Sequence, residues 1–511
     1  MTAPFPAPTP TPVQATATAP GGSLYANRRF LSVILLFVAV TPFTIVLLTR
    51  SDAEQASRNV VLAVISLVFT GLACLLLTAR NERGLGLATL RLGPWWISYF
   101  VVAFGLNSLL WIDPQETGSV SIIRHEYIPI AIMIATGALA CWTFGYLLAP
   151  ARFGRKLLRA VVSWAAPRGP WALRTPSFAV VLYGIGCSAR LIQILTGRFA
   201  YLADPVAAVT SPSSSNQFFA ILSQFSRFGL ILAAIDAIAL HRTTKARFTL
   251  IVIFGAEIAF GLISGMKSEF LLTVLCVGLV YSVTRGRLPR RMVFVGLLAG
   301  LLIVPINNAY RERVRRESQV ISSAAAIQLL PGLLTDTLGP SHLPELLASS
   351  PETLANRLRL IDGMAVIVQR TPSVIPYKGG SEFLTAPVVG LVPRAVWSSK
   401  PVLATGYRFN QEYYQSPSTI YSASAITFPG DLYRHAGIWG VIVGMLLLGM
   451  TCRLVQAELY PGKDLRLLLI YVPFFVLFVN MELDAVSILS SLVQTLVLSL
   501  LVTKMSFVSK R

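Results

Sequence analysis

The feature that most constrains this chain is a succession of apolar segments, each roughly the 15 to 23 residues that a helix needs to cross the hydrocarbon core of a membrane. Joints rich in charged residues, proline or glycine separate them. Only 13% of the 511 residues are charged and 54% are hydrophobic, whereas an average soluble domain has roughly 25% charged residues. Because lipid cannot satisfy exposed backbone groups, such segments fold as helices. The sequence therefore predicts an all-α polytopic membrane protein.

Twelve transmembrane helices are predicted. They cover approximately 31–49, 59–78, 93–112, 127–148, 177–196, 217–240, 248–264, 268–284, 292–309, 434–452, 466–481 and 485–503. Lys and Arg follow every even-numbered segment, as at Arg80 and Arg83 or at Arg152 and Arg155, and short cytoplasmic loops carry an excess of these residues. Both termini are therefore expected in the cytoplasm. The same rule explains the net charge of +20, so nucleic acid is not expected as a partner.

This topology divides the chain into four parts. They are a disordered cytoplasmic tail at 1–24, transmembrane helices 1–9 at 25–309, a large, mostly helical extracytoplasmic loop at 310–433, and transmembrane helices 10–12 with a cytoplasmic C-terminus at 434–511. The five cysteines lie in apolar stretches without a C-x-x-C spacing, which argues against a disulfide framework or a metal site. No cofactor and no metal are expected.

Three cations lie where charge is costly, and such residues are candidates for function. Arg190 and Arg227 fall within predicted spans, and Lys267 lies in the tight turn between the seventh and eighth spans. Arg227 lies about ten residues inside its span, so a polar cavity is expected beside it. Asp236 and Glu257 are expected to pair with neighbouring side chains.

The predicted outer loop contains a segment suited to a glycan diphosphate. In PRAVWSSKP, Pro393 and Pro401 favour a stiff, extended path on which Arg394, Trp397 and Lys400 recur at a spacing of three. Arginine binds phosphate oxygens in a bidentate way, and aromatic rings cover the apolar faces of sugars. The segment therefore predicts binding of a phosphorylated sugar.

These residues resemble the Wzy-type oligosaccharide repeat-unit polymerases, the family of O-antigen and exopolysaccharide polymerases. The similar parts are Pro393-Arg394 with Trp397 and Lys400-Pro401, the region of Gly406 and Phe409, and Pro429-Gly430-Asp431-Leu432-Tyr433 leading to Gly437 and Gly440. The order of about nine helices, a large outer loop and a few final helices is also similar. The resemblance is architectural over most of the chain and covers motifs over about fifty residues.

The resemblance implies a glycosyltransferase of the bacterial cytoplasmic (inner) membrane, acting on its outer face. Its substrates would be polyprenyl diphosphate-linked oligosaccharides, its product a surface polysaccharide such as lipopolysaccharide O-antigen or an exopolysaccharide, and a chain-length regulator protein could be a partner. It would need neither a nucleotide sugar nor a metal.

The expected site follows from this chemistry, because cations stabilise a departing diphosphate and a general base assists the attacking hydroxyl. The predicted substrate-binding residues are Arg190, Arg227, Lys267, Arg394, Trp397, Lys400, Arg408 and Tyr413. The candidate catalytic residues are His435, Glu412 and Asp431, with Glu382 as a further acid on the same side.

Two other functions remain open. An O-antigen ligase would transfer a finished glycan to a lipid core and would have the same architecture. A lipid-linked oligosaccharide flippase would show repeat symmetry and short outer loops, and neither is evident here. A polyprenyl-monophosphate sugar transferase is disfavoured because the first outer loop is only SDAEQASRN.

Overall fold

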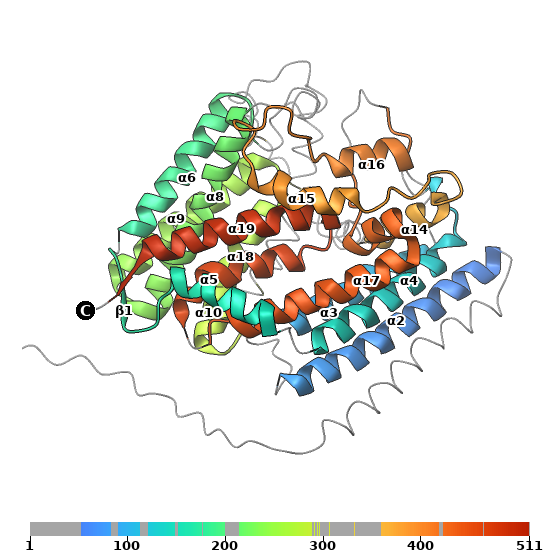
Figure 1. Ribbon diagram of the computed structural model, residues 1–511, viewed down its shortest axis with the longest axis horizontal. Coiled ribbons are helices and arrows are strands. Elements are labelled where there is room, and N and C mark those ends of the chain that lie inside the picture. Colours follow the sequence, from blue (N-terminus) through green and yellow to red (C-terminus); the bar gives the residue numbers. More distant parts are fainter. Residues whose placement is uncertain are drawn as a thin grey trace, which may run out of the picture.

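The computed structural model describes residues 53–82, 90–112, 121–148, 152–175, 177–199, 214–288, 359–417, 423–462 and 464–509, with isolated positions between 291 and 332. The predicted tail and first span lie outside these residues, as do most of the predicted ninth span and the first part of the predicted loop. The described part is a bundle of helices with one small sheet (Figure 1).

The elements follow one another in this order. They are α2 (Ala53–Asn81), α3 (Leu92–Phe100), η1 (Val101–Gly105), η2 (Leu106–Trp111), α4 (Tyr127–Leu147), α5 (Arg152–Ala165), β1 (Trp171–Leu173), α6 (Phe178–Leu195), α8 (Ser214–Ile235), η5 (Asp236–Leu240), α9 (Thr244–Ser264), α10 (Lys267–Arg285), α14 (Ile361–Arg370), α15 (Ser381–Leu391), α16 (Thr405–Tyr413), α17 (Phe428–Leu459), η6 (Leu465–Leu467), α18 (Leu468–Val479), α19 (Ala485–Ser506) and β2 (Phe507–Ser509).

Seven of the described helices are long and apolar enough to cross a membrane. They are α2, α4, α6, α8 with η5, α9, α17 and α19. The chain is thus a helical membrane protein, as predicted. The segments predicted as spans at 93–112, 268–284 and 466–481 are described but are not among these seven. Two predicted spans also differ in geometry or bounds from the helices observed. The segment 93–112 changes from α-helix to π-helix at Val101 and to 3-10 helix at Leu106, and the span predicted from 434 begins earlier, at Phe428.

Small residues let neighbouring helices approach closely, as is common in membrane bundles. A Cβ added at Gly186 of α6 would lie 2.2 Å from the backbone nitrogen of Ser226 in α8. Arg190 lies one turn after Gly186, and Arg227 directly follows Ser226. Gly229 of α8 meets Tyr183 of α6, so the two helices run antiparallel. The contact therefore places the two arginines on adjoining helices, about 7.5 Å apart along the axis.

Helix α17 is kinked near its start, where Ala436 and Gly437 leave helical geometry. Gly437 has a φ of 62°, which favours glycine. A Cβ there would also lie 2.8 Å from the hydroxyl of Tyr377. The kink separates a short first segment, which carries Asp431, Arg434 and His435, from the long remainder of the helix.

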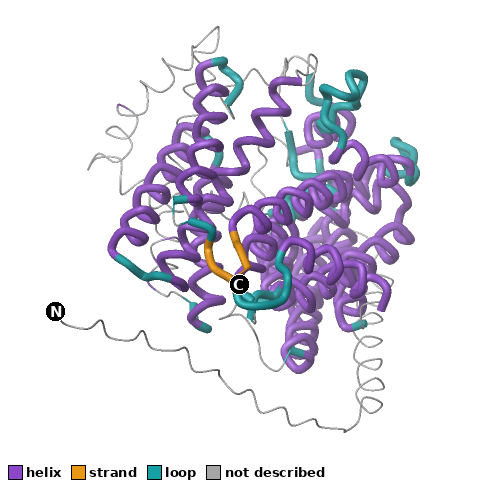
Figure 2. Tube along the Cα trace, turned by 60° about the vertical axis from the view of Figure 1, so that its left-hand side comes forward, coloured by secondary structure: helices purple, strands orange, loops and turns teal. Residues whose placement is uncertain are grey.

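The described part of the predicted loop is helical and is integrated into the bundle. Helix α14 packs against α4 and α17, and α15 packs against α19. A Cβ at Gly390 of α15 would lie 2.0 Å from the carbonyl oxygen of Ser490 in α19. At the C-terminus, β2 pairs antiparallel with β1, and Figure 2 shows this two-stranded sheet beside the chain end.

Candidate functional site

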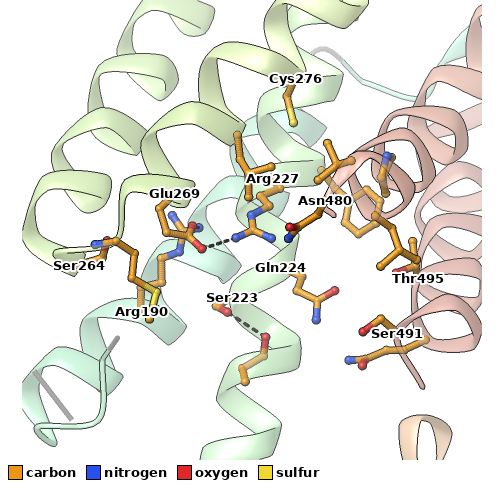
Figure 3. A pocket seen from close by; sticks show the side chains of 18 of the residues that line it. Arg190, Ser223, Gln224, Arg227, Ser264, Glu269, Cys276, Asn480, Ser491 and Thr495 are labelled. Atoms are coloured by element: carbon orange, nitrogen blue, oxygen red, sulfur yellow. Dashed lines mark hydrogen bonds and ion pairs between the residues drawn. The ribbon is translucent and has the colours of Figure 1, made fainter. Parts of the chain in front are cut away.

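A cavity of about 460 Å³ lies between α6, α8, α10, α18 and α19. On α8 its lining follows one helical face, which runs through Ala220, Gln224, Arg227 and Ile231. This spacing of three and four residues is what a helix of 3.6 residues per turn requires. Figure 3 shows Arg190, Arg227 and Glu269 on one side of the cavity and Asn480, Ser491 and Thr495 on the other.

Three charged side chains, Arg190, Arg227 and Glu269, line one wall, and Glu257 pairs with Arg190. We term these four residues the cavity cluster. Arg227 Nη2 lies 2.5 Å from Glu269 Oε1, and Arg190 Nη2 lies 3.6 Å from Glu269 Oε2. Arg190 Nη1 also donates to Glu257 Oε1 over 2.6 Å. The predicted pairing of Glu257 is confirmed, as is that of Asp236, whose Oδ1 lies 2.5 Å from His241 Nδ1.

The two arginines differ in how available they are. The Arg190 and Glu257 side chains are 5% and 3% exposed, whereas those of Arg227 and Glu269 are 37% and 26% exposed. Arg190 and Glu257 therefore form a closed buried pair. Arg227 lines the cavity and its side chain is partly exposed, in agreement with the predicted polar cavity beside it. An anionic ligand can therefore compete with Glu269 for its guanidinium.

The opposite wall is uncharged and combines polar groups with apolar side chains of α18, among them Val476 and Leu477. Its polar groups are amide and hydroxyl side chains at Asn480, Ser491, Gln494 and Thr495, and Gln224 and Ser223 of α8 adjoin it. Such groups both donate and accept hydrogen bonds. The cavity thus combines one accessible cation with neutral groups that suit hydroxyl-rich ligands.

Lys267 is the first residue of α10, two positions before Glu269. Its backbone thus lies at the end of the cavity wall, next to Met266, which lines the cavity. The sequence predicted that Arg190, Arg227 and the turn at Lys267 lie around one cavity. The backbone positions of these three agree with that prediction.

The segment from Pro393 to Lys400 is a turn, so the predicted extended path is wrong. The Pro393 carbonyl accepts hydrogen bonds from the amides of both Val396 and Trp397. Lys400 Nζ donates to the Val392 carbonyl over 2.9 Å. A proline fixes only its own φ and restricts the residue before it, so the residues between the two prolines remained free to fold back.

The turn lies beside α8 but outside the cavity lining. The Arg394 amide donates to Gln217 Oε1 over 2.7 Å, and its guanidinium donates to the Ser398 carbonyl. Trp397 Nε1 donates to Ser399 Oγ. Lys400 is buried, and this burial together with the charge of Arg394 lowers the pKa of its ammonium group. Gln217 is ten residues before Arg227, about 15 Å along the helix axis.

Asp431, Arg434 and His435 form a second buried group, which we term the kink cluster. Asp431 Oδ1 accepts two hydrogen bonds from Arg434, at 3.0 and 2.5 Å. Its Oδ2 accepts from the amides of Ala485 and Val486, at the start of α19. Both oxygens of Asp431 are therefore engaged, Oδ1 within α17 and Oδ2 in holding α17 to α19.

His435 is the member of the kink cluster with an unused polar atom. Its Nδ1 bonds the Gly379 carbonyl, while Nε2 makes no hydrogen bond to any described residue. Nε2 lies 3.5 Å from Asp431 Oδ1 and 3.7 Å from Glu382 Oε2. A proton acceptor is thus held between two carboxylates, although His435 does not line the cavity.

The turn between α18 and α19 connects the cavity to the kink cluster. Asn480 and Leu483 line the cavity, while the amide of Ala485 bonds Asp431. Between them, Asp484 caps α19 and accepts from Thr405 Oγ1 over 2.7 Å. Burial and the neighbouring Asp431 charge raise the pKa of the Asp484 carboxyl.

The remaining predicted residues lie on α16. Glu412 forms an ion pair with Lys378 at 2.7 Å, and Arg408 is exposed. Tyr413 is buried, and its hydroxyl lies 2.8 Å from Thr371 Oγ1. None of these three lines the cavity between the described helices.

Sequence reasoning missed Glu269 and the neutral wall. The signal for the wall is visible in hindsight, because Ser491, Gln494 and Thr495 share one helical face of the last predicted span. Glu269 was overlooked because it is the second residue of the eighth predicted span, and a carboxylate at the end of a span is ordinary. Among the described residues, no group of His, Cys, Asp or Glu side chains could hold a metal ion.

The helices and the cavity define a polytopic membrane protein with a charged, partly open internal site. The chain belongs to the family described as "Domain of unknown function (DUF8712)", whose model matches residues 188–510. This range contains the cavity, the kink cluster and all the predicted site residues, and it leaves out α2 to α5. No curated protein and no solved structure matches the chain.

Proposed function

We propose that this protein is a membrane glycosyltransferase that polymerises polyprenyl diphosphate-linked oligosaccharide repeat units. The observation that carries the proposal is the cavity between α6, α8, α10, α18 and α19, where a partly open arginine faces neutral hydrogen-bonding groups. A glycan diphosphate presents the matching chemistry, because its phosphates are anionic and its sugar is rich in hydroxyl groups.

In the proposed reaction, a hydroxyl oxygen of the incoming repeat unit attacks the anomeric carbon of the growing glycan. The bond between that carbon and the diphosphate oxygen breaks, and the lipid diphosphate leaves as an anion. The hydroxyl proton passes to a base. Arg227 would stabilise the charge that develops on the diphosphate, since a positioned cation in a water-poor site contributes strongly to transition-state stabilisation.

Glu269 is the counterion that the diphosphate would displace. Arg190 keeps Glu257 as its partner when Glu269 moves away, since the Arg190–Glu257 hydrogen bond of 2.6 Å does not involve Glu269. Of the candidate catalytic residues His435, Glu412 and Asp431, His435 has a ring nitrogen, Nε2, that makes no hydrogen bond to a described residue. His435 does not line the cavity, so this role requires the attacking hydroxyl to lie outside the cavity, on the far side of the α18–α19 turn.

The proposed topology has twelve spans, cytoplasmic termini and a site on the outer side of a bacterial inner membrane. Its support is the alternation of Lys and Arg along the chain. The cavity also lies near the helix ends that this topology assigns to the outer side, where α8, α10 and α19 begin. The turn at Arg394 is fastened to α8 at that same end.

A gel of surface polysaccharide from a strain lacking this protein tests the proposal. A polymerase predicts loss of the long ladder with retention of single-repeat products. Loss of glycan attachment with free polymer retained would instead identify a ligase. Accumulation of lipid-linked units on the cytoplasmic side would identify a flippase.

A further inference from the structure

Helix α5 lies at one end of the membrane bundle, where two candidate spans finish. Its Arg155 Nε lies 2.7 Å from Oε1 of Glu458, in the last turn of α17. Lys504, in the last turn of α19, lies 3.8 Å from the ring centroid of Trp164. Because the ends of spanning helices mark the membrane boundary, these contacts fix α5 at that boundary.

The surface of α5 divides into three sides, as expected for 3.6 residues per turn. One side packs on the protein core, through Leu158, Val161, Val162 and Ala165. An adjoining side is apolar yet uncovered, since Leu157 is 56% exposed and Trp164 is 49% exposed. The third side is exposed and basic or polar, with Arg152, Lys156, Arg159 and Ser163.

This combination differs from that of the spanning helices. Helix α2, for example, also exposes large apolar side chains, among them Phe69 and Leu76, but its stretch 59–79 contains no charged residue. On α5, by contrast, exposed apolar residues stand beside cations. Arg152 and Lys156 form no ion pair with any part of the chain that the structure describes.

We infer that α5 lies in the membrane interface and binds anionic lipid headgroups. Leu157 and Trp164 would enter the boundary between headgroups and acyl chains, where amphipathic helices bury their apolar side and where Trp is favoured. Arg152 and Lys156 would meet lipid phosphates, which attract basic segments close to the surface. Because the exposed polar side of α5 is positively charged, we expect it to bind an anionic lipid surface.

Depth measurements test the orientation of α5. Full-length protein in a cysteine-free background carries a fluorophore at Leu157→Cys or at Ser163→Cys, in nanodiscs of phosphatidylcholine and phosphatidylglycerol at 7:3. We expect brominated lipid to quench the label at 157 and aqueous iodide to quench the label at 163. Equal quenching of both labels by iodide would overturn the inference. So would protection of position 157 from both quenchers, which would identify a protein partner or a second copy as the occupant.

A second measurement tests the lipid charge with the same label at 157. We expect brominated phosphatidylglycerol to quench this label more than brominated phosphatidylcholine at the same mole fraction. The ratio of quenching by phosphatidylglycerol to quenching by phosphatidylcholine should fall close to one when Arg152→Gln and Lys156→Gln remove both charges. Each cation near an anionic surface favours contact with anionic lipid by about fivefold. The control pair Lys245→Gln and Arg247→Gln removes two exposed cations elsewhere and should leave the ratio unchanged. A ratio near one in the wild type would contradict the inference.

Discussion

The cavity cluster and the kink cluster both bury charged side chains, yet they use them differently. In the kink cluster, one carboxylate oxygen of Asp431 accepts hydrogen bonds from Arg434, and the other accepts from the first amides of α19. In the cavity cluster, Arg227 is held by one carboxylate and remains 37% exposed. Burial of a charged side chain is therefore by itself weak evidence for a ligand-binding site. Stronger evidence is a charged group that remains partly accessible after it has paired within the protein.

The α18–α19 turn connects the kink cluster to the cavity. The α18–α19 turn lines the cavity at Asn480 and Leu483, and the amide of Ala485 that follows it donates a hydrogen bond to Asp431. The kink cluster thus fixes the position of the neutral wall of the cavity. Its substitution should damage folding, whereas substitution in the cavity should damage ligand binding.

The largest effect is expected for Asp431→Asn. Removing one partner of a buried ion pair leaves an uncompensated charge on Arg434, which costs about 3–5 kcal/mol. We expect a large fall in the thermal midpoint of the purified protein and in its yield. The control Glu412→Gln, in the more exposed pair with Lys378, should cost less than about 1 kcal/mol. Normal stability of Asp431→Asn with lost activity would place Asp431 in the chemistry instead.

Arg227→Gln should reduce polymer formation with little change in stability. Loss of a hydrogen bond to a charged group costs about 1.5–3 kcal/mol, or roughly 10- to 150-fold in affinity or rate. Arg227→Lys keeps the charge and should retain part of the activity, which distinguishes electrostatics from packing. Polysaccharide ladders and protein levels from complemented strains provide the measurement. Ladders of normal length from Arg227→Gln would remove this residue from the site.

Glu269→Gln should act in the opposite direction on anion binding. The neutral amide no longer competes for Arg227, so the affinity for inorganic pyrophosphate should rise by about tenfold, as expected for one charged hydrogen bond. Calorimetry on the purified protein measures it, with Glu482→Gln, outside the cavity lining, as control. Weaker pyrophosphate binding by Glu269→Gln would show that Glu269 positions Arg227 rather than competing with the ligand.

The smallest effect is expected for Arg394→Ala. Its guanidinium bonds the Ser398 carbonyl and is absent from the cavity lining, and its backbone bond to Gln217 survives the substitution. Substitutions at such positions usually change free energies by about 0.5 kcal/mol or less, or roughly twofold. A loss of ladder equal to that of Arg227→Gln would show that the turn closes over the substrate.

Apolar length was enough to predict the seven described spanning helices and the place of Arg227 within one of them. The helix pair α6–α8 could not be derived, since the closeness of Gly186 to Ser226 depends on packing between segments distant in sequence. For the same reason the sequence did not reveal that Glu269 neutralises Arg227 or that α18 and α19 complete the cavity. Local propensity likewise could not show that the Pro393 turn folds back onto itself.

The central claim is that the cavity binds a glycan diphosphate and that Arg227 acts on it. The most direct measurement incubates purified protein in nanodiscs with lipid-linked single repeats extracted from the deletion strain. Wild-type protein should produce a ladder of longer glycans and release one polyprenyl diphosphate for each bond formed. Arg227→Gln should bind the lipid weakly and form little product, while Glu412→Gln should match the wild type. Absence of both ladder and released lipid diphosphate from folded wild-type protein would contradict the account.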